Sequence, residues 1–189
     1  TKQKSTDPIL KKCLVYASLE KCILEKPSAA IIANNTSNHI DISLKLAKEG
    51  IDLFIEKPLS NNIKNITQLS KIVKSKKLLT MMGCNLRFHP CIKKIKQLID
   101  KKTIGKILSV QVESGSYLPN WHPNENYQKS YAARNDLGGG VILTCIHEID
   151  YLYWFFGMPY SIISQSGKYS NLKIDVEDLS LSIIKFPKN

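Results

Sequence analysis

The feature that most constrains this chain is a pattern of strand, loop and helix that repeats through its first half. Short apolar runs at residues 28–33, 51–55 and 78–82 predict buried strands, and amphipathic stretches at 39–48 and 63–73 predict the helices between them. Strands that alternate with helices of this length indicate βαβ units with right-handed crossovers. The sequence therefore predicts an α/β fold with a doubly wound parallel sheet, in which ligands bind beyond the carboxyl ends of the strands.

The second half of the chain has a different pattern. It contains a predicted helix at 92–101, a long predicted strand at 106–116, a polar loop at 117–136, one strong helix at 141–156 and strand-like runs at 161–166 and 179–186. Strands of this kind around a helix predict an α+β domain with an open, mostly antiparallel sheet. We therefore divide the chain into residues 1–86 and residues 87–189.

Composition narrows the function classes. The net charge of +11 comes from 27 basic and 16 acidic residues, but all except two of the basic residues are lysine and they are spread along predicted helices. This distribution argues against a nucleic-acid partner. No run reaches the roughly 18 apolar residues of a membrane span, which predicts a cytoplasmic protein without a membrane partner. Five cysteines without a CxxC pair or a histidine at ligand spacing predict buried, reduced thiols and no metal site.

The first candidate for chemistry is Glu56-Lys57-Pro58, which ends a predicted strand. A proline restricts the residue before it to an extended conformation, so Lys57 is presented in a defined way. Its compact charge can polarise a hydroxyl or carbonyl oxygen. The alternative interpretation of this tripeptide is an ordinary surface salt bridge.

The second candidate is His147 on the predicted helix 141–156. Apolar residues at helical spacing predict a core-facing stripe, formed by Ile142, Ile146, Ile149, Tyr153 and Phe156. A polar stripe contains Thr144, His147, Tyr151 and Trp154. A neutral imidazole there can accept a hydroxyl proton, although a structural histidine is the alternative. Glu148 and Asp150 either orient His147 or are solvated.

Three loop features leave alternatives open. The glycines at 138–140 permit either an anion site at the helix N-terminus or a plain helix entry. His89 and His122 are either structural residues or lie at the rim of a substrate site.

Four segments taken together resemble the Gfo/Idh/MocA family of oxidoreductases. They are AIIANNTSNH at 30–39, FIEKPL at 54–59, GCNLRFHP at 83–90 and LGGGVILTCIHEID at 137–150. The resemblance implies an N-terminal Rossmann domain that binds NAD or NADP. It also implies a C-terminal domain whose open sheet often mediates homo-oligomerisation, and substrates that are sugars, cyclitols or their derivatives.

The resemblance also implies residue roles. Lys57 corresponds to the catalytic lysine and His147 to the catalytic acid/base. The expected cofactor contacts are Asn34, Asn35, Thr36, His39, Glu56, Lys57 and Asn85. The expected substrate contacts are Arg87, Tyr131, Arg134, Thr144 and His147, of which Arg87, Tyr131 and Arg134 can instead contact the domain junction.

Two departures from the family pattern matter. Thr144 stands where many members have aspartate, so His147 needs another orienting partner, such as Asp150, or acts alone. The sequence also has no Gly-x-Gly-x-x-Gly turn for the cofactor pyrophosphate. We therefore expect the chain to be a fragment of a longer enzyme, with an unpaired sheet edge near Ile31 and a C-terminal domain that lacks its last strands.

The function expected from these residues is NAD(P)-dependent hydride transfer involving a sugar-type hydroxyl. The segment 121–134, with Tyr127, Tyr131 and Arg134, suits an acidic or nucleotide-linked sugar of surface polysaccharide biosynthesis, because a guanidinium pairs well with carboxylate or phosphate. One alternative is a non-catalytic scaffold or binding relative that has lost its cofactor loop. Another is a lyase or isomerase that uses bound NAD transiently.

Overall fold

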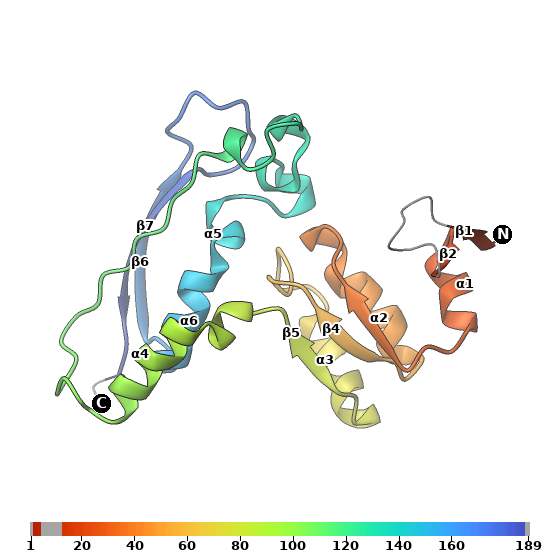
Figure 1. The fold of residues 1–189 in the computed structure, drawn as a ribbon, viewed down its shortest axis with the longest axis horizontal. Helices are drawn as coiled ribbons and strands as arrows, with labels where there is room; N and C mark the ends of the chain where they lie inside the picture. The colour runs from red at the N-terminus through yellow and green to blue at the C-terminus, as the bar shows by residue number, and fades with distance from the viewer. Residues whose placement is uncertain (1, 5–12, 188–189) are drawn as a thin grey trace.

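The computed structural model describes residues 2–4 and 13–187, and its chain forms two lobes (Figure 1). The first lobe contains β1 (Lys2–Lys4), β2 (Leu14–Tyr16), α1 (Leu19–Leu24), β3 (Ala29–Ile32), η1 (Thr36–Asn38), α2 (His39–Lys48), β4 (Asp52–Ile55), α3 (Ile66–Lys76) and β5 (Thr80–Met82). The second contains η2 (Asn85–Phe88), α4 (Pro90–Asp100), η3 (Leu118–Asn120), η4 (Tyr127–Lys129), η5 (Tyr131–Ala133), η6 (Asn135–Leu137), α5 (Val141–Thr144), α6 (Ile146–Phe156), β6 (Ser161–Gly167) and β7 (Leu179–Lys185).

The first lobe confirms the predicted parallel sheet. Strands β3, β4 and β5 pair in that order and run parallel, and β1 pairs with β2 in a separate antiparallel ribbon. The core lies between the sheet and its helices and contains Ile32, Ile40, Leu44, Leu46, Ala47, Ile51, Leu53, Ile55 and Leu69. Each buried isoleucine or leucine side chain of this core contributes about 1.5–3 kcal/mol of hydrophobic stabilisation.

Helix α2 shows how the sequence sets this packing. Ile40, Leu44 and Ala47 are spaced so that they share one face, which is buried, and Gly50 follows the helix with a positive φ of 81°. On the opposite face of the sheet Ile31 is 78% exposed. Within the described residues β3 pairs only with β4, so its other edge is open, as the sequence predicts.

The start of α3 differs from the prediction. The predicted helix begins at Ile63, whereas the structure begins it at Ile66 and leaves Ile63 91% exposed. The Asn62 side chain accepts the backbone N–H of Lys64 at 2.9 Å, and Asn65 adopts a left-handed conformation. Side-chain bonds of this kind compete with helical hydrogen bonds and delay the helix.

In the second lobe, β6 and β7 form the antiparallel pair that the sequence predicts. The long strand predicted at 106–116 is wrong, because that segment pairs with no described strand. Its alternating pattern does not correspond to a buried face, since Leu108 is 87% exposed and Val110 is 52% exposed. An alternating sequence forms a strand only where a neighbouring strand supplies hydrogen bonds.

The single helix predicted at 141–156 is also wrong, because Cys145 separates α5 from α6. The predicted core stripe is wrong as well, since Ile149 and Tyr153 are 42% and 47% exposed. The buried side chain of α6 is Phe155, which stacks against neighbouring aromatic rings.

The five cysteines are all free thiols, as expected, but they are less buried than the sequence suggests. Cys13, Cys22 and Cys91 are exposed, and Cys84 and Cys145 are partly buried. In the part of the chain that the structure describes, no helix has both the length and the apolar character to cross a bilayer.

Candidate functional site

The centre of the candidate site is the Lys57 ammonium group, which reaches from the first lobe to the second. Its Nζ donates a hydrogen bond of 2.8 Å to the backbone carbonyl of Thr144, the last residue of α5. A continuous helix would use that carbonyl internally, but Glu148 N–H instead bonds the carbonyl of Cys145. The helix break at Cys145 therefore supplies the acceptor for Lys57.

His147 lies one turn beyond this carbonyl, as the second residue of α6. Its Nδ1 and the hydroxyl of Thr144 are buried, and neither atom has a hydrogen-bond partner among the described residues. Burial and then the Lys57 ammonium hold the pKa of His147 below its ordinary value. The structure thus brings Lys57, Thr144 and His147 together and favours the neutral, proton-accepting imidazole.

Glu56 and Tyr131 lie beside this centre. The carboxylate of Glu56 accepts the backbone N–H of Lys57 at 3.2 Å, and any side chain at Gly83 would collide with that carboxylate. Burial and then the Glu56 charge raise the pKa of Tyr131. The hydroxyl of Tyr131, which lies near the Glu56 carboxylate, therefore stays protonated.

Asp150 is not available to orient His147, because Arg87 holds it. The guanidinium of Arg87 donates to both carboxylate oxygens of Asp150 at 2.8 and 2.7 Å, and it lies over the Trp154 ring at 5.7 Å. Burial and then Asp150 raise the pKa of the Cys84 thiol to about 11. Arg87 accordingly holds η2, the element that follows the first lobe, against α6.

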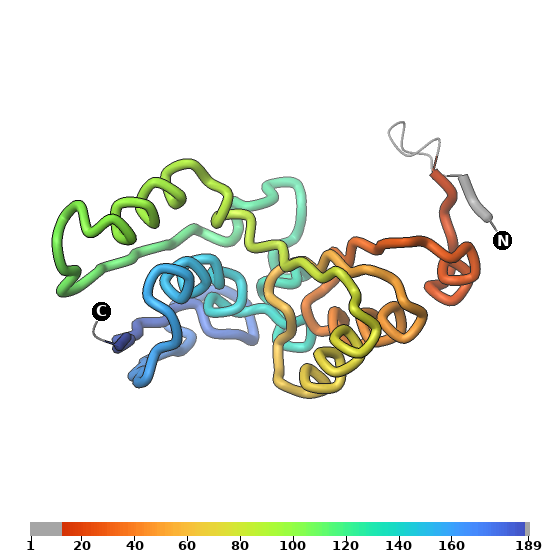
Figure 2. The backbone as a smooth tube through the Cα atoms, turned by 90° about the horizontal axis from the view of Figure 1, so that it is seen from below, coloured from red at the N-terminus to blue at the C-terminus, as the bar shows by residue number. Residues whose placement is uncertain are grey.

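The three glycines before α5 lie in a closely packed turn. The teal part of the chain that contains this turn adjoins the first lobe (Figure 2). A Cβ at Gly138 would lie 2.8 Å from Thr36 Cβ, and one at Gly139 would lie 2.7 Å from the Ala132 carbonyl oxygen. The Glu177 carboxylate accepts Ile142 N–H at 3.1 Å. Glu177 therefore occupies the helix terminus that the sequence left open to an anion.

The sequence did not single out Glu177. It lies 35 residues from its partner Ile142, in the loop before β7, so no local pattern could have found it.

The predicted cofactor contacts divide into accessible and enclosed residues. Asn34 and Asn85 are exposed and Asn35 is partly buried, whereas Thr36 is 3% exposed beneath Gly138. The prediction that His39 contacts a cofactor stays a prediction. His39 is 1% exposed, and its ring lies between two backbone carbonyl groups.

Arg134 lies away from this centre. It is exposed and donates to both carboxylate oxygens of Asp136, so its guanidinium already has an anionic partner. Its predicted role in binding a substrate anion stays a prediction.

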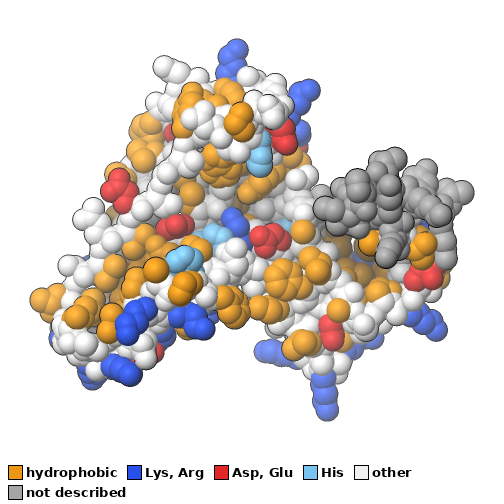
Figure 3. Space-filling view, in the orientation of Figure 1, with side chains coloured by type: hydrophobic (Ala, Val, Ile, Leu, Met, Phe, Trp, Pro, Cys, Tyr) orange, Lys and Arg blue, Asp and Glu red, His pale blue; other side chains and the backbone are white. Residues whose placement is uncertain are grey.

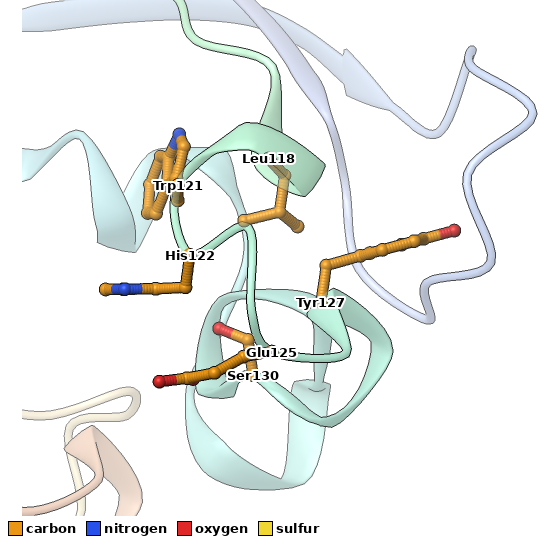
Figure 4. A pocket seen from close by; sticks show the side chains of 6 residues that line it. All are labelled: Leu118, Trp121, His122, Glu125, Tyr127 and Ser130. Carbon is orange, nitrogen blue, oxygen red and sulfur yellow. The ribbon is translucent and has the colours of Figure 1, made fainter.

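A hollow in the loop before α5 is lined by Leu118, Trp121, His122, Glu125, Tyr127 and Ser130 (Figure 4). It offers about 10 Å³, which is about the space of one water molecule. His122 itself is exposed. The hollow is therefore too small to accommodate a sugar.

A larger groove of about 490 Å³ lies between the lobes, and polar side chains gather near this junction (Figure 3). It is lined by Lys57, Pro58, Leu59, Ser60, Asn61, Asn62, Ile63, Ile66, Met82, Cys84, Leu143, Ile146 and Asp150. The volume of this groove lies within the range of roughly 300–1,000 Å³ that small-molecule sites have. Within the described ranges, no group of three His, Cys, Asp or Glu side chains could hold a metal ion.

The chain belongs to the GFO/IDH/MocA family. Residues 9–84 match the family model of the oxidoreductase NAD-binding Rossmann fold, and residues 92–189 match the model of the GFO/IDH/MocA C-terminal domain. This confirms the resemblance seen in the sequence.

The chain is also similar to curated relatives. The chain is 27% identical to a levoglucosan dehydrogenase of Pseudarthrobacter phenanthrenivorans over 88% of this chain and 48% of the relative. It is 29% identical to the scyllo-inositol 2-dehydrogenase (NAD(+)) of Bacillus subtilis over 79% of this chain and 42% of the relative. The chain spans about half the length of the curated relatives it matches.

The fold is similar to that of the WlbA dehydrogenase of Bordetella pertussis, solved in complex with NADH and UDP-GlcNAcA. The TM-score is 0.77 at 16% identity, over 90% of this chain and 49% of that one.

The residues present fit part of the NAD-type cofactor that the family implies. Asn34, Asn35, Glu56 and Lys57 follow the carboxyl ends of β3 and β4, where a doubly wound sheet binds its ligands, and none of the four is buried. The sequence has no Gly-x-Gly-x-x-Gly turn to bind a pyrophosphate. The residues present therefore fit the cofactor at these strand ends alone.

Proposed function

We propose that the protein is an NAD(P)-dependent dehydrogenase that acts on a hydroxyl group of a sugar, a cyclitol or a sugar derivative. The observation that carries this proposal is the meeting of Lys57 and His147. The two residues come from different lobes. Lys57 donates a hydrogen bond to the carbonyl of Thr144, which is 87 residues away and one turn before His147. The ammonium charge is therefore close enough to lower the pKa of the imidazole.

In this proposal neutral His147 removes the hydroxyl proton, and Lys57 stabilises the negative charge that develops on the substrate oxygen. The cofactor, when bound, supplies the nicotinamide that accepts the hydride. Buried polar atoms normally have hydrogen-bond partners, so the Thr144 hydroxyl and His147 Nδ1, which have none among the described residues, favour a functional role for this part of the molecule. Glu56 holds the backbone of Lys57, and Tyr131 contributes a neutral hydroxyl beside it.

The test uses the full-length protein with NAD and with NADP, and it measures formation of the reduced cofactor. The substrate panel contains cyclitols, neutral sugars, uronic acids and nucleotide-linked sugars, including the UDP-GlcNAcA found with the WlbA dehydrogenase. We expect turnover with at least one class. A protein that binds the cofactor and reduces it with none of these substrates would contradict the proposal.

Two alternatives give different results in the same assay. A scaffold that has lost its cofactor site shows no NADH binding by fluorescence. A lyase or isomerase that uses NAD transiently consumes its substrate without net formation of reduced cofactor. The partnerless polar atoms beside Lys57 favour the catalytic proposal over the scaffold.

We also propose that the second-lobe sheet joins copies of the protein. Ile163, Leu181 and Ile183 lie on one face of the β6–β7 pair and are each about two-thirds exposed. A contiguous exposed apolar face of this kind marks an interaction surface. Replacing Leu181 with aspartate should lower the mass measured by sedimentation, and an unchanged mass would contradict this interface.

A further inference from the structure

His39 is the first residue of α2, and its ring links two turns of the first lobe. Its Nδ1 lies 2.8 Å from the carbonyl oxygen of Pro58, and its Nε2 lies 3.0 Å from the carbonyl oxygen of Asn34. Asn34 follows β3 and Pro58 follows β4, so the ring joins the carboxyl ends of two neighbouring strands. The side chain is 1% exposed, which makes these carbonyl groups its polar surroundings.

Both ring nitrogens of His39 face carbonyl oxygens, at 2.8 Å for Nδ1 and 3.0 Å for Nε2. A carbonyl oxygen only accepts hydrogen bonds, and a neutral imidazole has one N–H to donate. We place this hydrogen on Nδ1 as part of the proposal, because the bond to Pro58 is the one that holds the turn after Lys57, and the ring spectrum described below tests the choice. If His39 did not make this buried hydrogen bond, the Pro58 carbonyl would have no partner, and a buried carbonyl without a partner costs free energy.

Three contacts around the turn hold Lys57. Its backbone N–H donates to Glu56, its Nζ donates to Thr144, and the residue that follows it is anchored by His39. We propose that His39 is a positioning residue for Lys57, which fixes the turn from which the ammonium group reaches the second lobe. The catalytic meaning of this contact rests on the proposed function, but the contact itself can be tested without it.

Two amide variants separate the two contacts of the ring. The side-chain nitrogen of asparagine can replace Nδ1, and that of glutamine can replace Nε2. His39→Asn should therefore keep the bond to Pro58, and His39→Gln should keep the bond to Asn34. Ser43→Ala is the matched control, because Ser43 is fully buried on the same helix and its hydroxyl donates to the carbonyl of His39.

The measurement is trace acetylation of the full-length protein with acetic anhydride, with peptide mass spectrometry to compare Lys57 with the exposed Lys71. Loss of the hydrogen bond that holds the turn should raise the relative rate at Lys57 roughly fivefold in His39→Gln. His39→Asn and Ser43→Ala should leave the rate close to that of the wild type. Equal rates in the two His39 variants, or an equal rise in Ser43→Ala, would overturn the proposal.

A measurement on the wild-type protein tests the proposal even if a variant does not fold. The ¹⁵N spectrum of the His39 ring should show a protonated Nδ1, with a coupling through the hydrogen bond to the Pro58 carbonyl carbon. An Nδ1 without a hydrogen would overturn the proposal. These readouts do not require turnover, so an inactive wild-type protein would reject the proposed function and leave the role of His39 to be decided by them.

Discussion

The imidazole of His147 is subject to influences of opposite sign. Burial and the Lys57 ammonium lower its pKa, whereas the carboxylates of Glu148, Glu56 and Asp150 raise it, and the lowering effects prevail. Asp150 is a weak influence because its charge is paired with Arg87. The result is a base that stays neutral where an ordinary histidine, with a pKa of about 6.5, begins to take up a proton.

Replacing Lys57 with methionine should raise the pKa of His147, because the change removes the nearby positive charge. An NMR titration of the His147 ring in the folded protein measures this shift. Lys64→Met is the control, since Lys64 is exposed in the loop before α3. A titration curve that is the same in wild type and Lys57→Met would contradict the electrostatic contact.

The same shift has a consequence for stability. The folded protein binds the His147 proton more weakly than the unfolded chain does. As the pH falls below about 6.5, the unfolded chain takes up this proton first, so the contribution of His147 to stability is lost in that range.

At the scale of elements, α5 depends on a close fit between Gly140 and Glu177. Gly140 has a positive φ of 101°, and a Cβ there would lie 2.6 Å from the carboxyl carbon of Glu177. Glu177 also accepts the backbone N–H of Val141 with its own carbonyl at 3.0 Å. The helix that leads to His147 therefore begins only where glycine allows this approach.

We expect Gly140→Ala to lower the free energy of unfolding by about 1–3 kcal/mol, from backbone strain and displacement of Glu177. Urea denaturation measures the change. Gly115→Ala is the control, because a Cβ at Gly115 would meet no atom within 4 Å. Equal effects of the two substitutions would show that the junction does not require a glycine at position 140.

The sequence predicts elements well where one local pattern decides them. The spacing of Ile40, Leu44 and Ala47 is sufficient to place α2. The sequence-based prediction fails at 106–116, because a strand depends on a neighbouring strand. It also fails at Cys145, where the helix break accompanies a hydrogen bond from Lys57, a residue distant in the chain.

For the candidate site, the resemblance to the family was sufficient to single out Lys57, Glu56, Tyr131 and His147, which the structure brings together. Their partners were less accessible to sequence reasoning. The pairing of Arg87 with Asp150 spans 63 residues and can be seen only once η2 and α6 are packed together. Burial of His39 likewise depends on the fold around it.

In the whole molecule, the site exists only while the two lobes keep their relative position. Lys57 joins the lobes directly through Thr144. Within the second lobe, the Arg87 to Asp150 ion pair joins η2, the element that follows β5, to α6, with the two side chains 34% and 15% exposed. The Arg134 to Asp136 pair has the same chemistry, but it is local and more exposed. Comparing the two pairs separates the effect of joining distant segments from that of the ion pair itself.

A double-mutant cycle on Arg87→Ala and Asp150→Ala, read from urea denaturation, should give a coupling of about 1 kcal/mol, as a bidentate and partly buried pair should. The corresponding cycle on Arg134 and Asp136 should give a smaller coupling. Couplings of the same size would mean that the pair between Arg87 and Asp150 adds nothing by joining η2 to α6.

The most direct test of the account compares wild type, Lys57→Met and Lys64→Met full-length protein for NADH affinity and for turnover with the best substrate of the panel. We expect Lys57→Met to retain its cofactor affinity and to lose turnover by roughly 100-fold or more, with Lys64→Met close to wild type. Turnover that is unchanged in Lys57→Met would contradict the catalytic role of Lys57 and, with it, the proposed function of the site.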